Sequence, residues 1–114
     1  MEPNWRIVIL EEAETWIRSL LPDQRDRVAA ALNVLERLGP ALGRPKVDSV
    51  RGSRHANMKE FREGTIRFLF AFDPTRAAIV LIGGDKKNQW KKWYAATIPR
   101  ADALFDQWLA SLEE

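Results

Sequence analysis

The sequence predicts one α+β domain spanning residues 1–114, with helices packed on one face of a small antiparallel sheet. Three observations predict it: a short β-branched run near the start, two segments with apolar residues at helical spacing, and three strand-like segments before a helical pattern returns. The predicted order is β-α-α-β-β-β-α-α. A chain of 114 residues can form one domain with a substantial core, but not two ordinary ones.

The first third of the chain predicts a strand followed by a helical hairpin. Residues 5–10, "WRIVIL", fit a buried strand, and the acidic residues after them suit a helix N-terminus. This helix extends to about Leu20. A second helix opens at Pro22 and keeps its apolar spacing until Gly39 and Pro40 end it.

The middle of the chain predicts an antiparallel meander of three strands, at residues 57–63, 65–73 and 77–85. Gly64 makes the first connection tight, and "DPTR" (73–76) suits a type I turn. Because side chains alternate along a strand, one face of the second strand is wholly apolar and should join the core. Arg67 lies on the other face, which is only half apolar.

The rest of the chain predicts a loop and two C-terminal helices. Residues 40–56 contain two prolines, two glycines and five cations if His55 is counted, and such a long loop in a compact domain is a candidate functional segment. After residue 85 the pattern is helical to about Ala96. A last helix should begin near Thr97–Pro99, with Thr97 as its cap.

Composition excludes several kinds of chemistry. The chain has no cysteine and one histidine, so disulfides, thiolate zinc sites and thiol nucleophiles are excluded, and we expect neither a metal nor a cofactor. The longest apolar run has six residues, far fewer than a membrane span needs, and the start lacks a signal-peptide pattern. We therefore expect a cytoplasmic protein without membrane contact.

The charge is concentrated in the middle of the chain. Residues 44–100 carry 13 basic and 5 acidic side chains, a net charge of +8, although the whole chain has only +2. This asymmetry is typical of a surface that binds a polyanion such as nucleic acid. The alternative is that these cations are scattered over separate faces.

The run "GGDKKNQWKKWY" (83–94) combines cations with aromatic side chains. Helical spacing places Lys86 with Trp90 and Trp93 on one side, and Lys87 with Lys91 and Tyr94 on another. The tryptophans either anchor the helix to the sheet or stack on bases. Tyr94 beside Lys87 is a candidate proton donor, because a nearby cation lowers the pKa of a phenol; the alternative is a solvated helix face.

Two further cations lie on adjacent predicted strands. The strand register could bring Lys59 and Arg67 close together, and two cations without a carboxylate favour an anion between them. Glu60 and Arg62 should occupy the face opposite Lys59. His55 follows Ser53 and Arg54, but residues adjacent in sequence do not form a catalytic triad.

Three segments together resemble a known family: "MKEFR", "IRFLFAFDP" and "GGDKKNQWKKWY". The likeness extends over roughly residues 50–110 and is to the phage Gp49-like branch of the RelE/ParE superfamily, the bacterial type II toxins related to HigB. It implies a ribosome-dependent mRNA endoribonuclease that is silenced by a cognate antitoxin, often a helix-turn-helix protein. In such enzymes the RNA 2′-OH attacks the adjacent phosphate without a metal and leaves a 2′,3′-cyclic phosphate.

The resemblance also implies roles for individual residues. Lys59 matches a strand lysine that serves as base or phosphate ligand, Arg67 an arginine that steadies the phosphate, Lys87 or Lys86 a basic pair after the last strand, and Tyr94 an aromatic that stacks or donates a proton. We therefore expect Lys59, Arg67, Lys87 and Tyr94 to be catalytic. The expected substrate-binding residues are His55, Arg62, Lys86, Trp90 and Lys91.

Two other functions remain open from the sequence. The ParE branch of the superfamily inhibits DNA gyrase and is not a nuclease, so a gyrase inhibitor is one alternative. A non-catalytic RNA-binding module is the other, for which alanine at Lys59 or Tyr94 would weaken binding and its salt dependence without abolishing a reaction.

Overall fold

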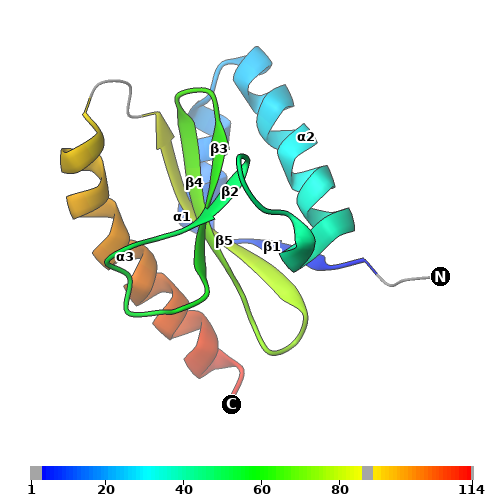
Figure 1. Cartoon of the computed structure of the whole chain (residues 1–114), viewed down its shortest axis with the longest axis vertical. Coiled ribbons are helices and arrows are strands. Elements are labelled where there is room, and N and C mark those ends of the chain that lie inside the picture. Colours follow the sequence, from blue (N-terminus) through cyan, green and yellow to red (C-terminus); the bar gives the residue numbers. More distant parts are fainter. Residues whose placement is uncertain (1–3, 86–88, 114) are drawn as a thin grey trace.

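A five-stranded sheet forms the centre of the molecule in the computed structural model, which describes residues 4–85 and 89–113. The strand order is β1-β5-β4-β3-β2 (Figure 1). β1 runs parallel to β5, and the other neighbours are antiparallel. The strands are β1 (Arg6–Ile9), β2 (Val47–Ser49), β3 (Met58–Glu63), β4 (Ile66–Phe72) and β5 (Ala77–Asp85). The predicted α+β class and the three-stranded meander are confirmed.

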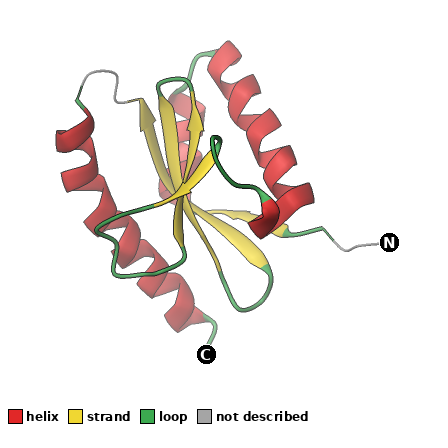
Figure 2. Cartoon of the chain, in the orientation of Figure 1, coloured by secondary structure: helices red, strands yellow, loops and turns green. Residues whose placement is uncertain are grey.

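Helices cover both faces of this sheet, not one as predicted (Figure 2). α1 (Glu11–Ser19) and α2 (Pro22–Leu38) form the predicted hairpin on one face, and α3 (Trp90–Ser111) packs on the other. The central strands explain the difference, because they are apolar on both sides. In β4, Phe68 and Phe70 join the core under α1 and α2, while Leu69 and Ala71 join the core under α3.

The predicted loop at residues 40–56 is partly structured. A short 3₁₀ helix (Gly39–Ala41) continues from α2, and β2 pairs with β3 at the edge of the sheet. The prediction missed β2 because the strand has only three residues and lies among prolines, glycines and charges. The segment therefore adds a strand to the edge of the meander.

The two predicted C-terminal helices are one helix. α3 runs through Pro99, and Thr97 is buried inside it instead of capping a new helix. A proline in a helix interior costs about 3 kcal/mol, but Pro99 is exposed and the apolar stripe on either side of it is continuous against the sheet. Packing thus outweighs the local stop signal.

Within residues 4–85 and 89–113, no helix is long and apolar enough to cross a bilayer. The same residues contain no cluster of three or more side chains suited to holding a metal ion.

Candidate active site

The register between β3 and β4 decides which charged side chains meet. Glu63 pairs with Ile66 across a two-residue turn, so Arg62 lies opposite Arg67 and Lys59 lies opposite Phe70. Lys59 therefore shares the α2 face of the sheet with Phe70, whereas Arg67 lies on the α3 face with Glu60 and Arg62. The expectation that Lys59 and Arg67 face each other is wrong. The expectation that Glu60 and Arg62 lie opposite Lys59 is correct.

Glu60 is the centre of the charged cluster on the α3 face. Its side chain is only 5% exposed, and it accepts a hydrogen bond from Arg62 Nε at 3.1 Å. Arg67 Nε lies 3.7 Å from the other carboxylate oxygen, to which the Tyr94 hydroxyl also donates a hydrogen bond. Glu60 thus lies between Arg62 of β3 and Arg67 of β4, whereas the pair without a carboxylate that the sequence predicts is Lys59 and Arg67.

Arg67 is held in place from several directions. The guanidinium lies over the Trp90 ring, 4.4 Å from its centroid, and donates to the carbonyl oxygens of Gly64 and Ile66. Its Nε is buried and has no hydrogen-bond partner among the described residues. The Glu60 carboxylate lies 3.7 Å from this nitrogen, beyond hydrogen-bond distance, and an unsatisfied buried donor is costly.

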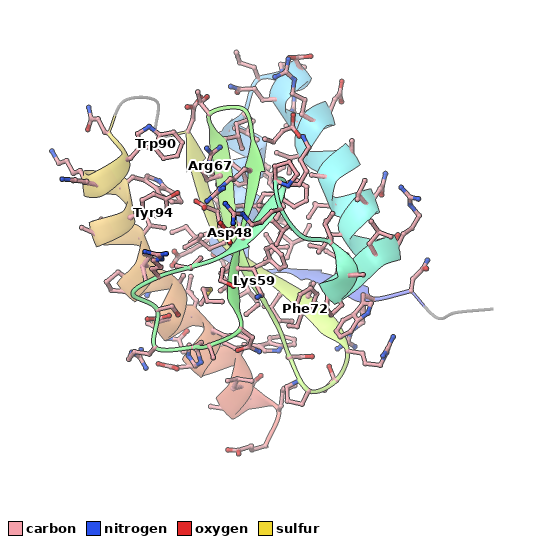
Figure 3. The ribbon with its side chains drawn as sticks, in the orientation of Figure 1. Asp48, Lys59, Arg67, Phe72, Trp90 and Tyr94 are labelled. Carbon is pink, nitrogen blue, oxygen red and sulfur yellow. The ribbon has the colours of Figure 1, made fainter. Side chains whose placement is uncertain are left out.

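The pKa of Tyr94 is raised, whereas the sequence predicts a lowered one. Burial, and then the hydrogen bond and negative charge of Glu60, raise the pKa of its phenol to about 12, against a smaller lowering by Arg67. A lowered pKa was expected from Lys87, which lies outside the described residues. Tyr94 is therefore protonated at neutral pH, and its hydroxyl donates to Glu60. Figure 3 labels Tyr94 on α3, near Trp90.

A cleft of about 440 Å³ opens beside these residues, between β2 and α3. A volume of this size accommodates a small ligand such as one nucleotide. Glu60, Arg62 and Tyr94 contribute to its lining, and Asp48 reaches Arg62 at 3.4 Å. The remaining lining residues are Ser49, Val50, Arg51 and Ile98.

Two glycines of β5 allow helices to approach the sheet closely on both sides. A Cβ on Gly83 would overlap the Trp16 indole of α1, and a Cβ on Gly84 would overlap the Trp93 indole of α3. Trp93 also packs against the core under α3, so its predicted role as an anchor is confirmed. Trp90 instead lies against Arg67, at the edge of the charged cluster.

His55 belongs to a separate cluster near the other end of α3. Its Nε2 lies 2.7 Å from Asp106, which also accepts a hydrogen bond from Arg54 at 2.7 Å. Ser53 donates to the buried Asp102 at 2.5 Å, not to His55. The structure therefore does not bring His55 together with Tyr94.

Of the expected site residues Lys86, Lys87 and Lys91, the structure describes only Lys91. Lys91 is exposed on the first turn of α3, close in sequence to Tyr94. Lys86 and Lys87 lie outside the described residues. Glu60 is the residue that the sequence analysis missed as a site member, although its place on the same strand face as Arg62 was the available signal.

Solved structures of RelE-type toxins have the same fold. A mutant of the Escherichia coli toxin RelE in the free state superposes with a TM-score of 0.61 at 13% identity, covering 86% of this chain and 94% of that one. The toxin–antitoxin complex RelBE2 from Mycobacterium tuberculosis gives a TM-score of 0.59 at 19% identity, over 72% and 98% of the two chains. The molecule therefore has the α+β fold of the RelE toxins.

Similar sequences identify the family within this fold. The family described as "Phage derived protein Gp49-like" matches residues 15–106. A Mycobacterium tuberculosis protein named "Putative toxin HigB3" is 49% identical over 107 residues, which cover 92% of this chain and 94% of that protein. A second, "Putative toxin HigB2", is 47% identical over 110 residues, and the match spans 55% of its length. The chain belongs to the Gp49-like family, together with these HigB-like proteins.

Proposed function

We propose that the chain is the toxin of a type II toxin–antitoxin system and acts as a ribosome-dependent mRNA endoribonuclease. The observation that carries this proposal is the Tyr94–Glu60 hydrogen bond, which lies with Arg62 at a cleft large enough for a nucleotide. Arg67 lies beside Glu60. Cleavage by a 2′-OH needs a base, an acid and cations at the phosphate, and these residues supply all three.

In the proposed reaction, Glu60 takes the proton of the 2′-OH while the 2′-oxygen forms a bond to the adjacent phosphorus. Tyr94 gives its proton to the 5′-oxygen as the bond between that oxygen and phosphorus breaks. Arg67, with its unsatisfied Nε, and Arg62 stabilise the charge that develops on the phosphate oxygens. The products are a 2′,3′-cyclic phosphate and a free 5′-OH.

The hydrogen bond between Tyr94 and Glu60 closes the proton cycle. After the reaction Glu60 is protonated and Tyr94 is a phenolate, and the proton returns directly from the carboxyl to the phenol because the two groups are already in contact. The raised pKa of Tyr94, about 12, favours this return. The site would reset without a bound metal or an external buffer.

The resemblance to the family supports a proposal for the location and the partners. We propose a cytoplasmic location, ribosome-bound mRNA as substrate, and a cognate antitoxin, with a helix-turn-helix protein as the first candidate. The resemblance also supports Lys86 and Lys87 as phosphate contacts, and the positions of Trp90 and Lys91 on the first turn of α3 support contacts to flanking RNA.

Mapping of mRNA ends on programmed ribosomes tests the proposal. Wild-type protein should cut the mRNA and leave a 2′,3′-cyclic phosphate upstream of the cut, and Tyr94→Phe, which removes one hydroxyl, should slow cleavage by about 10²- to 10⁴-fold. Arg25→Gln, on the exposed side of α2, is the control and should cleave normally. Uncut mRNA with wild-type protein would refute the nuclease, and DNA damage signalling with translation initially intact would favour the gyrase alternative.

A further inference from the structure

A second cleft, of about 220 Å³, lies on the opposite side of β2 from the proposed active site. Both clefts are lined by Asp48 and Ser49, so the width of one strand separates them. β2 has three residues and forms the edge of the sheet, where a ligand can pass from one face to the other. The second cleft is lined by Pro40, Leu42, Gly43, Arg44, Val47, Asp48, Ser49, Lys59 and Phe72.

The side chains of this second cleft suit a nucleotide. Lys59 Nζ donates to the neutral Ser49 hydroxyl at 3.0 Å and has no carboxylate partner among the described residues. Arg44 stands at the rim with an exposed guanidinium, and the half-buried Phe72 offers an aromatic surface (Figure 3). Lysine and arginine bind phosphate, and an aromatic ring stacks on a base or a ribose.

A line of alternating charges connects the two clefts across the sheet edge. Arg44 Nε lies 3.6 Å from Asp48, Asp48 lies 3.4 Å from Arg62, and Arg62 lies 3.1 Å from Glu60. Carboxylates that separate cations in this way hold the cations in a row before a ligand arrives. A polyanion that crosses β2 would meet positive charge on both sides of the strand.

We infer that the Lys59 cleft is a binding subsite for a nucleotide that flanks the scissile bond. Single-stranded RNA crosses the sheet edge at β2, with the reacting phosphate at Glu60 and Tyr94 on one face and a neighbouring phosphate at Lys59 and Arg44 on the other. This inference rests on the proposed function for the identity of the ligand. It assigns Lys59 to binding, whereas the sequence analysis expected it to be catalytic.

The test separates binding from chemistry in single-turnover cleavage of ribosome-bound mRNA with enzyme in excess. Lys59→Gln, which can still bond to Ser49, should raise the half-saturating enzyme concentration about tenfold and leave the saturating rate within about twofold. Arg44→Gln should act in the same direction. The control, Arg25→Gln, removes the same charge from the opposite end of α2 and should change neither value.

Other outcomes would overturn the inference. A saturating rate reduced tenfold or more by Lys59→Gln would place Lys59 in the chemistry, and unchanged RNA parameters together with weaker antitoxin binding would make the cleft a protein contact. If wild-type protein does not cleave, the proposed function has failed, and the subsite is then judged by binding of a 2′-O-methyl RNA nonamer. In that assay Lys59→Gln should reduce the slope of log K against log salt by about 0.7, and an unchanged slope refutes the subsite.

Discussion

At its N-terminal end α3 holds Tyr94 against Glu60 and Arg67. About 12 to 18 Å further along the same helix, Asp102 and Asp106 contact the loop at residues 53–55. Both clusters combine carboxylates with cations. In the second, the carboxylates are fully engaged: Asp102 is 2% exposed and accepts two hydrogen bonds, and Arg54 and then His55 hold the pKa of Asp106 below its usual range.

The first cluster differs in one unsatisfied donor and in the protonation of its phenol. Arg67 Nε has no hydrogen-bond partner among the described residues, and Tyr94 keeps its proton at neutral pH. The second cluster contains serine, histidine and aspartate, the residue types usually associated with catalysis, yet it joins a loop to a helix. The two clusters therefore differ in the state of their donors more than in their residue types.

The largest expected effect is a loss of mRNA cleavage when Glu60 of the first cluster is replaced, with no such loss for the second cluster. Glu60→Gln keeps the size of the side chain but removes the proposed base, so mRNA cleavage should fall by about 10²- to 10⁴-fold. Asp106→Asn is the matched change at the other end of α3 and should leave cleavage within about threefold. Equal losses in the same ribosome assay would show that the two ends of α3 act as one site.

A substitution in the second cluster should have the opposite result, a loss of stability without a loss of activity. Asp102→Ala leaves the Ser53 hydroxyl and the Arg54 backbone N–H without their acceptor, which should cost about 1–3 kcal/mol of unfolding free energy. Urea unfolding measures this loss, and the folded protein should still cleave mRNA. Reduced cleavage at unchanged stability would contradict a purely structural role for Asp102.

The state of Tyr94 can be read directly, because it is the single tyrosine of the chain. Ultraviolet titration of the phenolate should give a pKa of about 12, and Glu60→Gln should lower it toward the ordinary value. Folding raises this pKa, so the protonated phenol contributes to the free energy of unfolding. This contribution is complete below the pKa of the unfolded chain, about 10, and is lost as pH rises through the pKa of the folded protein. A wild-type titration near 10 would remove Glu60 as the partner of the phenol.

The smallest effect is expected at His55. His55→Gln removes a partly exposed contact with Asp106, while Arg54 still binds that carboxylate. The loss of stability should be below about 1 kcal/mol, and cleavage should stay within about twofold. A tenfold loss of cleavage would return His55 to the substrate-binding residues that the sequence predicts.

Local patterns were enough to predict most of the fold. The predicted hairpin and meander match α1, α2 and β3–β5 closely, since caps, turns and apolar spacing are properties of short segments. The placement of α3 was missed because the second face of β4, with Leu69 and Ala71, looked half apolar beside Arg67. Which face a helix covers depends on contacts between distant segments.

The candidate site was predicted only in part, for a geometrical reason. Arg67 and Tyr94 were identified and do lie together with Glu60. Lys59 was placed beside Arg67, but the two-residue turn after Glu63 sets the register, and a shift of one residue would have moved every side chain of β3 to the opposite face. Sequence spacing alone does not determine which side chains of β3 and β4 share a face of the sheet.

The glycine pair of β5 has a consequence for how the proposed acid and base, Tyr94 and Glu60, are aligned. Trp93 and Tyr94 are neighbours on α3, and Trp93 rests where a side chain on Gly84 would be. The absence of a methyl group in the sheet thus determines how deeply the helix sits, and with it the reach of the phenol toward Glu60. A larger residue at position 84 would push Trp93 and the start of α3 away from the sheet. The distance between Tyr94 and Glu60 can therefore be changed by the size of one uncharged residue, without altering any group that carries a proton.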